Sequence, residues 1–476
     1  MIRILAAVVV LMAAAPVRAI GAQAAADQTA TATTKKDAAA PKQKKAKKPK
    51  SDVPAPDEKV DPDAEPVETG KGFRTTWKQH PSIRAGNVFR MDFQAKFQED
   101  GRRSYDGAIE LDPWELHRNR VGIQGHLFKK IEYEVERELT EKELTEKDIT
   151  AGVAPKSPWK DVYTNLTFIK NAQVQIGRFK VPFGLDTLTG VTQNDFIYRS
   201  LGANYLTPSR DTGVMVHGRF FKRGLSYSVG AFQHDGDNAR SRKIQGGDET
   251  FAARVSGTPL RRMNPKAFTQ LEIGSAYTIS KLSDDSFRPN GLRGRTLLTQ
   301  DMFFEPVYVK GRRSRWEADA DWTFGPGSAR AEYTMVLDTR LNQGLADNDL
   351  EDARSRAWYV TGSWVLTGEE KKRPLRPAND FLQGGIGAVE VVARFERLWF
   401  DSLGTGEAYR STRAEFVLPE GEHAFTIGVN WTLNRFVKVQ INGIREDVDR
   451  ARSPVLPEKF PPGAFWNRVV RLQFVL

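Results

Sequence analysis

The six histidines are the first residues to test for catalytic or metal-binding chemistry. They lie at positions 80, 117, 126, 217, 234 and 423, so no two of them have the His-x-x-x-His spacing of a helical zinc site. The sequence also has no Gly-x-Ser-x-Gly elbow and no glycine-rich phosphate loop that ends in lysine. A serine and a histidine can still meet in the fold, with His126 and His217 as candidates for a hydrolase. Polar residues that line a water-filled interior are the simpler interpretation of both.

The sequence offers few residues for thiol chemistry or metal binding. The chain has no cysteine, which excludes disulfides, zinc-thiolate sites and cysteine nucleophiles. The acidic repeat ELTEKELTEKD at 138–148 lacks the ligand spacing of a calcium loop, and its Glu and Lys residues three to four apart suit a charged outer loop. We therefore expect no metal and no cofactor.

Basic residues give the chain a formal net charge of +11, but they are unevenly placed. Residues 1–80 hold 14 Lys and Arg against 9 Asp and Glu, which leaves 57 against 51 in the other 396 residues. A region so near charge balance argues against a surface that binds nucleic acid.

The elements that must position any site are two-faced strands. From about residue 86 onward, apolar residues recur at every second place, as in Phe89, Met91 and Phe93 alternating with Arg90 and Asp92. A period of two indicates strands with one apolar and one polar face. We place sixteen strands, at 87–97, 117–127, 130–138, 159–169, 172–180, 211–221, 224–234, 249–257, 268–280, 312–324, 327–338, 354–366, 386–400, 423–433, 435–446 and 466–476.

The connections alternate between tight turns and links of about a dozen to thirty residues, except at 258–267 and 367–385. Short turns at one end and long loops at the other are typical of outer-membrane barrels. The strands have the length of a tilted bilayer crossing, whereas sandwich strands average five to six residues. Tryptophans near strand ends fit aromatic girdles, and a chain that stops on a strand can close a barrel with its first strand. For 367–385 we expect either a mobile periplasmic turn or one that folds into the channel mouth.

The N-terminal part has a different composition. Arg3, an apolar run and small residues near Ala19 and Ala24 predict a secretory signal peptide at 1–24. The Lys-, Ala- and Pro-rich stretch that follows cannot bury enough apolar surface to fold, so we expect a disordered periplasmic segment at 25–80. The barrel is expected at 86–476.

One segment carries a specific resemblance. The motifs GRFKVPFG, FIYRSL and PSRDTGV surround and fill the long link 181–210, and RNRVGIQGHLFKKIEYEVERE and GVNWTLNRFVKVQING extend the likeness. The chain resembles the phosphate-selective porin O and P family over roughly 86–476. The resemblance implies an all-β transmembrane antiparallel barrel of about 16 strands in the outer membrane, usually a homotrimer, with a third long loop folded inward as a constriction.

The family pattern, placed on this chain, predicts which side chains line the path of small anions such as phosphate. These candidates are Arg118, Arg120, Arg178, Lys180, Arg199 and Arg210. Arg118 and Arg120 also share the polar face of their strand, which sends them into the lumen. Guanidinium groups match phosphate and carboxylate oxygens, and their field is stronger where water is scarce.

The same polar faces carry acids that weaken such a preference: Asp211, Glu317, Asp319, Asp321, Glu390 and Glu396. General diffusion with a weak anion bias is therefore favoured over strict phosphate selectivity. Two other classes stay open, an outer-membrane barrel hydrolase and a secreted β-rich surface or carbohydrate-binding protein. The favoured reading is a porin and not an enzyme.

Overall fold

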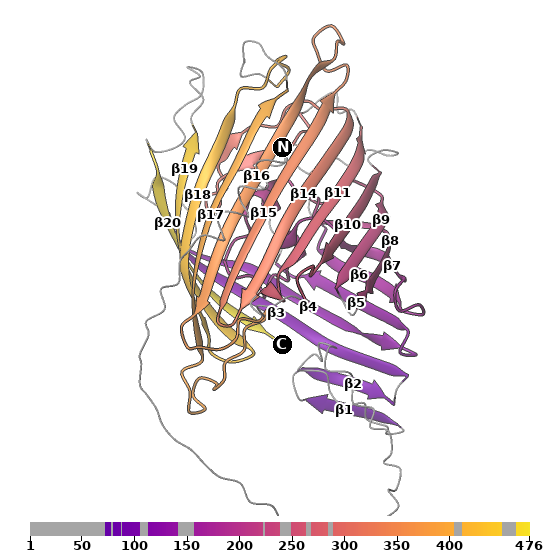
Figure 1. The fold of residues 1–476 in the computed structure, drawn as a ribbon, viewed down its shortest axis with the longest axis vertical. Helices are drawn as coiled ribbons and strands as arrows, with labels where there is room; N and C mark the ends of the chain where they lie inside the picture. Colours follow the sequence, from indigo (N-terminus) through magenta and orange to yellow (C-terminus); the bar gives the residue numbers. More distant parts are fainter. Residues whose placement is uncertain are drawn as a thin grey trace, which may run out of the picture. The chain divides into compact units, whose positions relative to one another are not determined.

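A computed structural model gives the arrangement of the strands (Figure 1). It describes residues 72–77, 80–86, 88–104, 113–140, 157–221, 224–238, 249–262, 268–283, 289–403, 412–449 and 463–476. All of these belong to one compact unit, Pro56–Leu476, of the two into which the chain divides. The predicted signal peptide, most of the Lys-rich segment and the acidic repeat from residue 141 lie outside the described residues.

Sixteen long strands form one closed antiparallel barrel, in agreement with the number and placement predicted from alternation. They are β3 (Phe89–Arg103), β4 (Trp114–Leu127), β5 (Ile131–Glu138), β6 (Trp159–Leu166), β7 (Gln173–Lys180), β8 (Arg210–Phe220), β9 (Leu225–Phe232), β10 (Thr250–Gly257), β11 (Glu272–Leu282), β14 (Gly311–Phe324), β15 (Gly327–Arg340), β16 (Leu350–Val365), β17 (Ala388–Ser402), β18 (Glu420–Thr432), β19 (Val437–Asp449) and β20 (Phe465–Val475).

The barrel closes between its last and first strands. β20 pairs with β3, with Phe474 opposite Phe97, and Leu476 exchanges two backbone hydrogen bonds with Ala95. Closure satisfies the backbone groups that an open sheet edge would expose to lipid.

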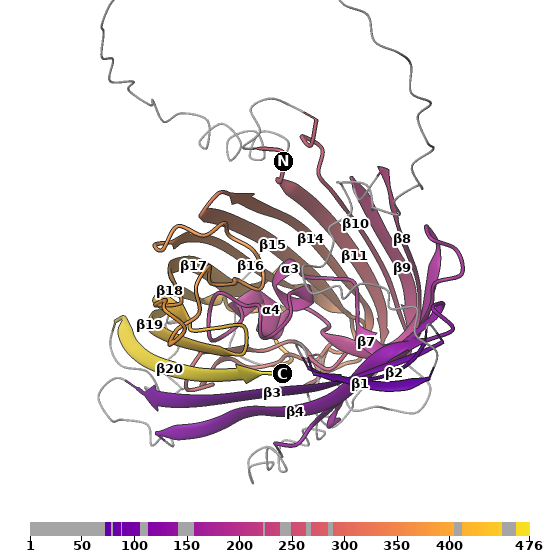
Figure 2. The ribbon, with the colours of Figure 1, turned by 90° about the horizontal axis from the view of Figure 1, so that it is seen from below.

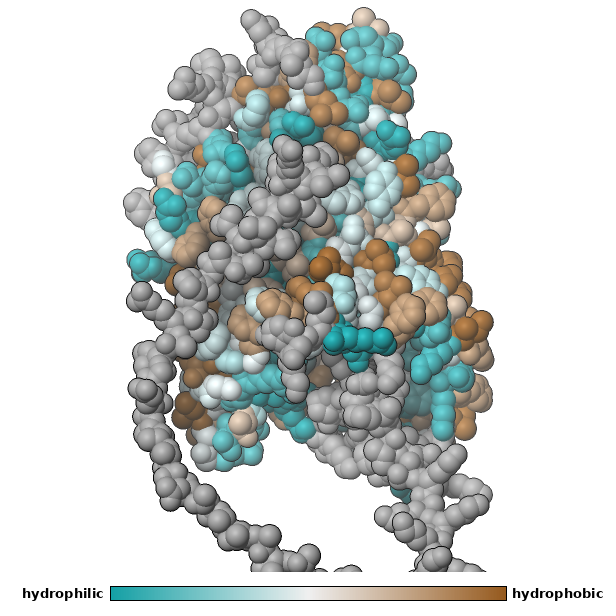
Figure 3. All heavy atoms as spheres, in the orientation of Figure 1, coloured by the Kyte–Doolittle hydropathy of each residue, from teal (hydrophilic) through white to brown (hydrophobic). Residues whose placement is uncertain are grey.

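Side chains alternate across the wall as the sequence predicts. On β14, Trp316 is 37% exposed on the outward face, whereas its neighbour Glu317 is fully buried inside. In Figure 3, hydrophobic residues form patches among hydrophilic ones over the visible face. A lipid-facing exterior and a polar interior explain both observations. No helix within the described part of the chain is long and apolar enough to cross a membrane.

Two short strands extend the barrel beyond the prediction. β1 (Phe73–Trp77) pairs with β2 (Pro81–Ala85), and β2 pairs with β3 at Phe89–Asp92, where the pairing with β20 has ended. Residues 73–77 were expected to lack secondary structure, so the boundary of that segment at residue 80 was wrong. The charged five-residue stretch FRTTW is too short for a clear period-two signal.

Four further elements of the described chain lie in loops. The link between β7 and β8, residues 181–209, contains the short helices α3 (Leu185–Leu188) and α4 (Leu201–Tyr205), and we call it the constriction loop. Figure 2, seen from below, shows both helices inside the ring of strands. The link between β11 and β14 holds the small hairpin of β12 (Gly294–Arg295) and β13 (Met302–Phe304). The constriction loop therefore folds inward as predicted.

Candidate functional site

The constriction loop crosses the interior from one wall to the opposite one. At its start, Val181 and Phe183 are buried with Phe179, Met215 and Phe232 on the wall of β7–β9. Gly184 allows the turn that follows, because its φ of +85° suits glycine and an added Cβ would lie 2.9 Å from Thr207 Cγ2. Farther on, α4 contacts β16 and β17.

Charged and amide side chains of the far wall hold the loop through its backbone. Arg394 donates to the Tyr198 carbonyl at 3.0 Å, and Arg471 donates to the Ile197 carbonyl at 2.8 Å. The Glu396 carboxylate accepts from the Leu201 N–H at 2.6 Å. Side chains on two separate strands, β17 and β20, hold the consecutive residues Ile197 and Tyr198. The loop is therefore preorganised in one conformation.

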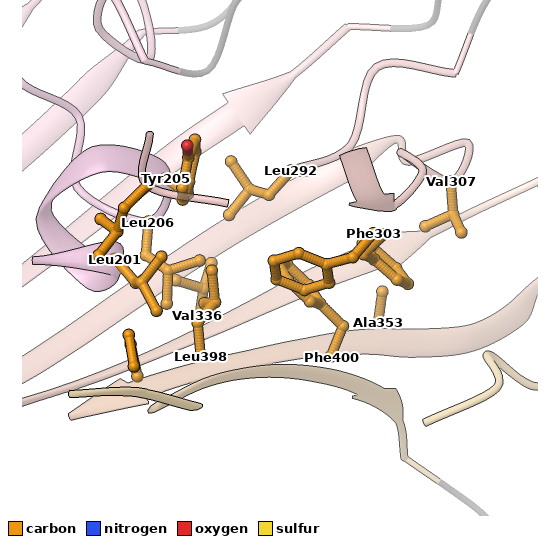
Figure 4. Close-up of a cluster of buried hydrophobic side chains, with 14 of the residues drawn as sticks. Leu201, Tyr205, Leu206, Leu292, Phe303, Val307, Val336, Ala353, Leu398 and Phe400 are labelled. Carbon is orange, nitrogen blue, oxygen red and sulfur yellow. The ribbon is translucent and has the colours of Figure 1, made fainter. Parts of the chain in front are cut away.

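An apolar cluster fills part of the interior beside α4 (Figure 4). Leu201, Tyr205 and Leu206 of the constriction loop meet Leu292 and Phe303 of the link 283–310. On the wall, Phe400 stacks on Phe304 with ring centroids 4.1 Å apart. We call this cluster the interior plug, and it blocks water-filled passage through the space that it occupies.

The long turn between β16 and β17 enters the barrel from the other end. Lys371 is 2% exposed and its Nζ lies 2.6 Å from Asp195 Oδ1 in the constriction loop. Arg373 reaches the same carboxylate, with Nη2 3.2 Å from Asp195 Oδ2. Of the two outcomes expected for 367–385, folding into the channel mouth is the one observed.

Most of the candidate basic residues gather on the wall of β4–β8 beside the constriction loop. Arg120 Nε lies 2.7 Å from Glu138 Oε2, and Arg210 Nη2 lies 2.5 Å from Asp161 Oδ2. Arg199, within the loop, lies 3.5 Å from Asp186 Oδ1. These three candidates are therefore paired with adjacent carboxylates, and Arg178, described below, is a fourth.

Two candidates at the constriction have neutral partners. The Lys180 ammonium donates to the carbonyls of Leu188 and Thr189 at 3.1 and 3.0 Å. Arg118 donates to the Gln98 side-chain oxygen. Among the described residues, no carboxylate lies within the 4.0 Å ion-pair limit of either cation.

Comparison with known proteins gives the family. The family model for phosphate-selective porin O and P matches residues 87–475. The chain belongs to this porin family. It is 23% identical over 408 residues to Porin O of Pseudomonas aeruginosa, which covers 80% of this chain and 86% of that protein.

Solved structures agree in fold. The barrel is similar to OmpT of Vibrio cholerae, an outer membrane protein, in a loop-deletion form and in an in-vitro folded form. The TM-scores are 0.51 and 0.50 at 11% identity, and the matches cover 82% of this chain and 100% and 98% of those chains. The protein is thus an outer-membrane porin barrel, and family and relative point to a channel rather than an enzyme.

Arg178 is also paired with a carboxylate in this porin. Its guanidinium pairs with Asp237 of the next long loop and donates to the Trp159 carbonyl at 2.9 Å. Asp237 also donates its backbone N–H to the Arg210 carbonyl at 3.0 Å, so Arg178 lies at the outer end of β7 beside Arg210.

Three of the candidates, Arg120, Arg199 and Arg210, also interact electrostatically. Burial is the main cause that lowers the pKa of Arg199 below its ordinary value; Asp186 opposes the shift, and Arg210 and Arg120 add to it. A guanidinium stays protonated through such a shift. The positive charges of Arg120, Arg199 and Arg210 are therefore close enough to repel one another.

The sequence did not single out several cations that the structure brings to this site. Lys438 donates to the Thr192 and Asn194 carbonyls at 3.2 and 3.0 Å, and Lys96 pairs with Glu136. Alternation places both side chains inward, but only the fold shows that Lys438 contacts the constriction loop and that Lys96 pairs with Glu136 on β5. Lys371 and Arg373 carried no periodic signal, because they lie in an irregular turn.

The described part of the chain contains no assembled hydrolase or metal site that would favour an alternative to a channel. His217 Nε2 lies 3.1 Å from Asn165 Oδ1, and no serine hydroxyl bonded to His126 or His217 occurs there. The group Asp100, Glu115 and His117 has ligand-like spacing, but both carboxylates are held at 2.6 Å by Arg471 and Arg102. Those guanidinium groups would compete with any metal cation.

Proposed function

We propose that this porin is a diffusion channel with a weak preference for small anions, phosphate among them. The observation that carries the proposal is the Lys180 ammonium, which is held at the constriction by two neutral carbonyls. Arg118 on β4 and Lys438 on β19 likewise donate to neutral oxygens, those of the Gln98 side chain and of the Thr192 and Asn194 carbonyls. Charges without an adjacent counter-ion keep their field in a narrow, partly desolvated passage, and this field raises the local concentration of anions.

The pairing of the other cations supports general diffusion over strict phosphate selectivity. A tight phosphate site needs several guanidinium or ammonium groups free to converge on one oxyanion. Arg120, Arg199 and Arg210 already donate to carboxylates, which would have to be displaced. We therefore place phosphate among the permeating anions and not as a tightly bound ligand.

A planar-bilayer recording of the refolded protein in a tenfold KCl gradient tests the proposal. The reversal potential should have the sign of an anion-preferring channel, and millimolar phosphate should leave most of the chloride current unblocked. A cation-selective reversal potential would contradict the anion preference. Complete block by micromolar phosphate would show strict selectivity instead.

Membership of the family also supports a homotrimer in the outer membrane, which we propose for this chain. The mass of the protein in a mild detergent, measured by light scattering, should correspond to three copies. A stable monomer that conducts at full level would overturn the proposal.

A further inference from the structure

Three arginines lie together on the outward face of the barrel, near the end with the long loops. They are Arg445 on β19, Arg468 on β20 and Arg103 on β3, three strands that neighbour one another in the closed sheet. Each side chain is exposed, in contrast to the buried residues before and after Arg445 and Arg468 on their strands. We call these three residues the outer arginine patch.

Like charges meet within the patch. Arg468 lies directly opposite Arg103 in the β20–β3 register, and like charges at such positions destabilise a sheet. Among the described residues, no Asp or Glu forms an ion pair with any of the three. An arrangement of this kind is explained best by an external anion.

Other outward arginines on the same barrel form ion pairs with aspartates. On β16, Arg354 Nε lies 2.7 Å from Asp401 Oδ1, and Arg356 pairs with the same carboxylate. On β17, Arg397 Nη2 lies 3.0 Å from Asp449 Oδ2. Acids do lie near the patch, since Asp447 follows Arg445 on the outward face of β19, but among the described residues none forms an ion pair with the three arginines.

The level of the patch on the wall indicates the source of the anion. Directly below it, the outward residues are apolar and exposed: Val470, Leu472 and Phe474 on β20 and Ile441 on β19. Trp466 lies opposite Arg445, and Trp114 covers Gly101 two residues before Arg103. Tryptophans of this kind mark the level of the lipid headgroups, so the patch lies where the hydrocarbon region ends.

We propose that the outer arginine patch binds a phosphate group of a glycolipid headgroup in the outer leaflet. Three guanidinium groups from adjacent strands can each direct paired N–H donors at one phosphate. Trp466 and Trp114 offer flat surfaces to the sugar and upper acyl region of the same lipid. The site lies on the outside of the wall, separate from the conducting interior.

The test compares the full-length porin with the triple variant Arg103→Gln, Arg445→Gln, Arg468→Gln. A matched control, Lys281→Gln, Arg312→Gln, removes two cations that lie opposite each other on β11 and β14. Native mass spectrometry would measure binding of lipid A that carries two phosphates and of the same lipid without phosphates. Heat-modifiable gel migration would confirm that all three proteins are folded.

The wild type and the control should bind the phosphorylated lipid more tightly than the dephosphorylated one. The triple variant should bind the phosphorylated lipid roughly tenfold more weakly and lose the discrimination. Equal binding of both lipids by the wild type would overturn the proposal. So would a triple variant that binds lipid normally but no longer assembles, because the patch would then be a contact between copies of the chain.

Discussion

Lys371 and Asp195 join two parts of the interior that are far apart in the sequence. Lys371 lies in the turn after β16, Asp195 lies in the constriction loop, and their charged atoms are 2.6 Å apart. Arg373 adds a second cation to the same carboxylate, and Lys371 also pairs with Glu390 of the wall. The constriction is thus fixed from the periplasmic end as well as by the loop itself.

Replacing Lys371 with Met should loosen this fixation. The change leaves Asp195 and Glu390 buried with one cation fewer, which should cost about 1–3 kcal/mol. Single-channel recordings should then show more current fluctuation than the wild type. Lys372→Met is a close control, because Lys372 is exposed and pairs with Glu370, and its recordings should match the wild type. Equal noise in both variants would mean that Lys371 does not hold the loop.

Acid should protonate Asp195 only after this pairing is removed. Burial alone would raise the pKa of Asp195, but Lys371 and Arg373 hold it well below its usual range. A lowered carboxyl pKa contributes stability that is present above the unfolded pKa and is lost only as the pH falls through the folded pKa. In the wild type, Asp195 should therefore stay ionised from about pH 7 to pH 4 and contribute no change of conductance in that range.

In the double variant Lys371→Met, Arg373→Gln, burial becomes the dominant influence on Asp195 and should raise its pKa above about 4. Asp195 should then take up a proton between about pH 7 and pH 4, and the constriction should change conductance in that window. A pH titration of single-channel conductance checks this. A flat titration of the double variant would contradict the assigned role of the two cations.

The lipid-facing assignment predicts unequal effects of arginine at two wall positions. Ile441→Arg places a charge on an outward side chain that is 52% exposed, and it should destabilise the barrel by about 2–4 kcal/mol near the bilayer centre. Gln124→Arg places the same charge on the inward face opposite Glu134, and it should change stability little. Urea unfolding in lipid vesicles measures both; equal losses would show that the register is wrong.

The interior plug predicts a gain of conductance. Phe400→Ala removes a buried ring that stacks on Phe304, and such a truncation costs about 3–5 kcal/mol of packing. The plug should loosen while the backbone hydrogen bonds keep the barrel closed. Phe395→Ala, on the same strand but 47% exposed outward, is the matched control. Single-channel conductance should rise for the first variant and stay unchanged for the second.

Alternation predicts the wall of this porin because each strand separates lipid from water. That contrast gives every second residue a different environment, so all sixteen strands could be placed from the sequence. The inward fold of the constriction loop was predicted from the resemblance of this segment to the porin family. The sequence analysis did not predict that the link 283–310 enters the interior plug. The pairs Leu297-Leu298 and Phe303-Phe304 are nevertheless an apolar signal in a loop expected to face water.

The charge state of the site was harder to predict than its location. Arg210 has its partner Asp161 on β6, and Arg199 has its partner Asp186 in the same loop. No sequence pattern joins residues on separate strands, so only the fold shows which cations are neutralised. The candidates that carry the proposal, Lys180 and Arg118, could not be distinguished from the other four beforehand.

Selectivity should depend most on these two cations. The double variant Arg118→Gln, Lys180→Gln removes charges at the constriction that have no carboxylate partner in the part of the chain that the structure describes. The reversal potential in a tenfold salt gradient should therefore move toward cation preference. The shift should be larger around 0.1 M than around 1 M salt, because screening shortens from about 10 Å to about 3 Å. Lys129→Gln, Lys130→Gln removes the same number of charges from the exposed turn after β4, far along the wall from the constriction loop. Its reversal potential should stay near that of the wild type. If both double variants shift it equally, the preference arises from the overall charge of the barrel, and the constriction does not set it.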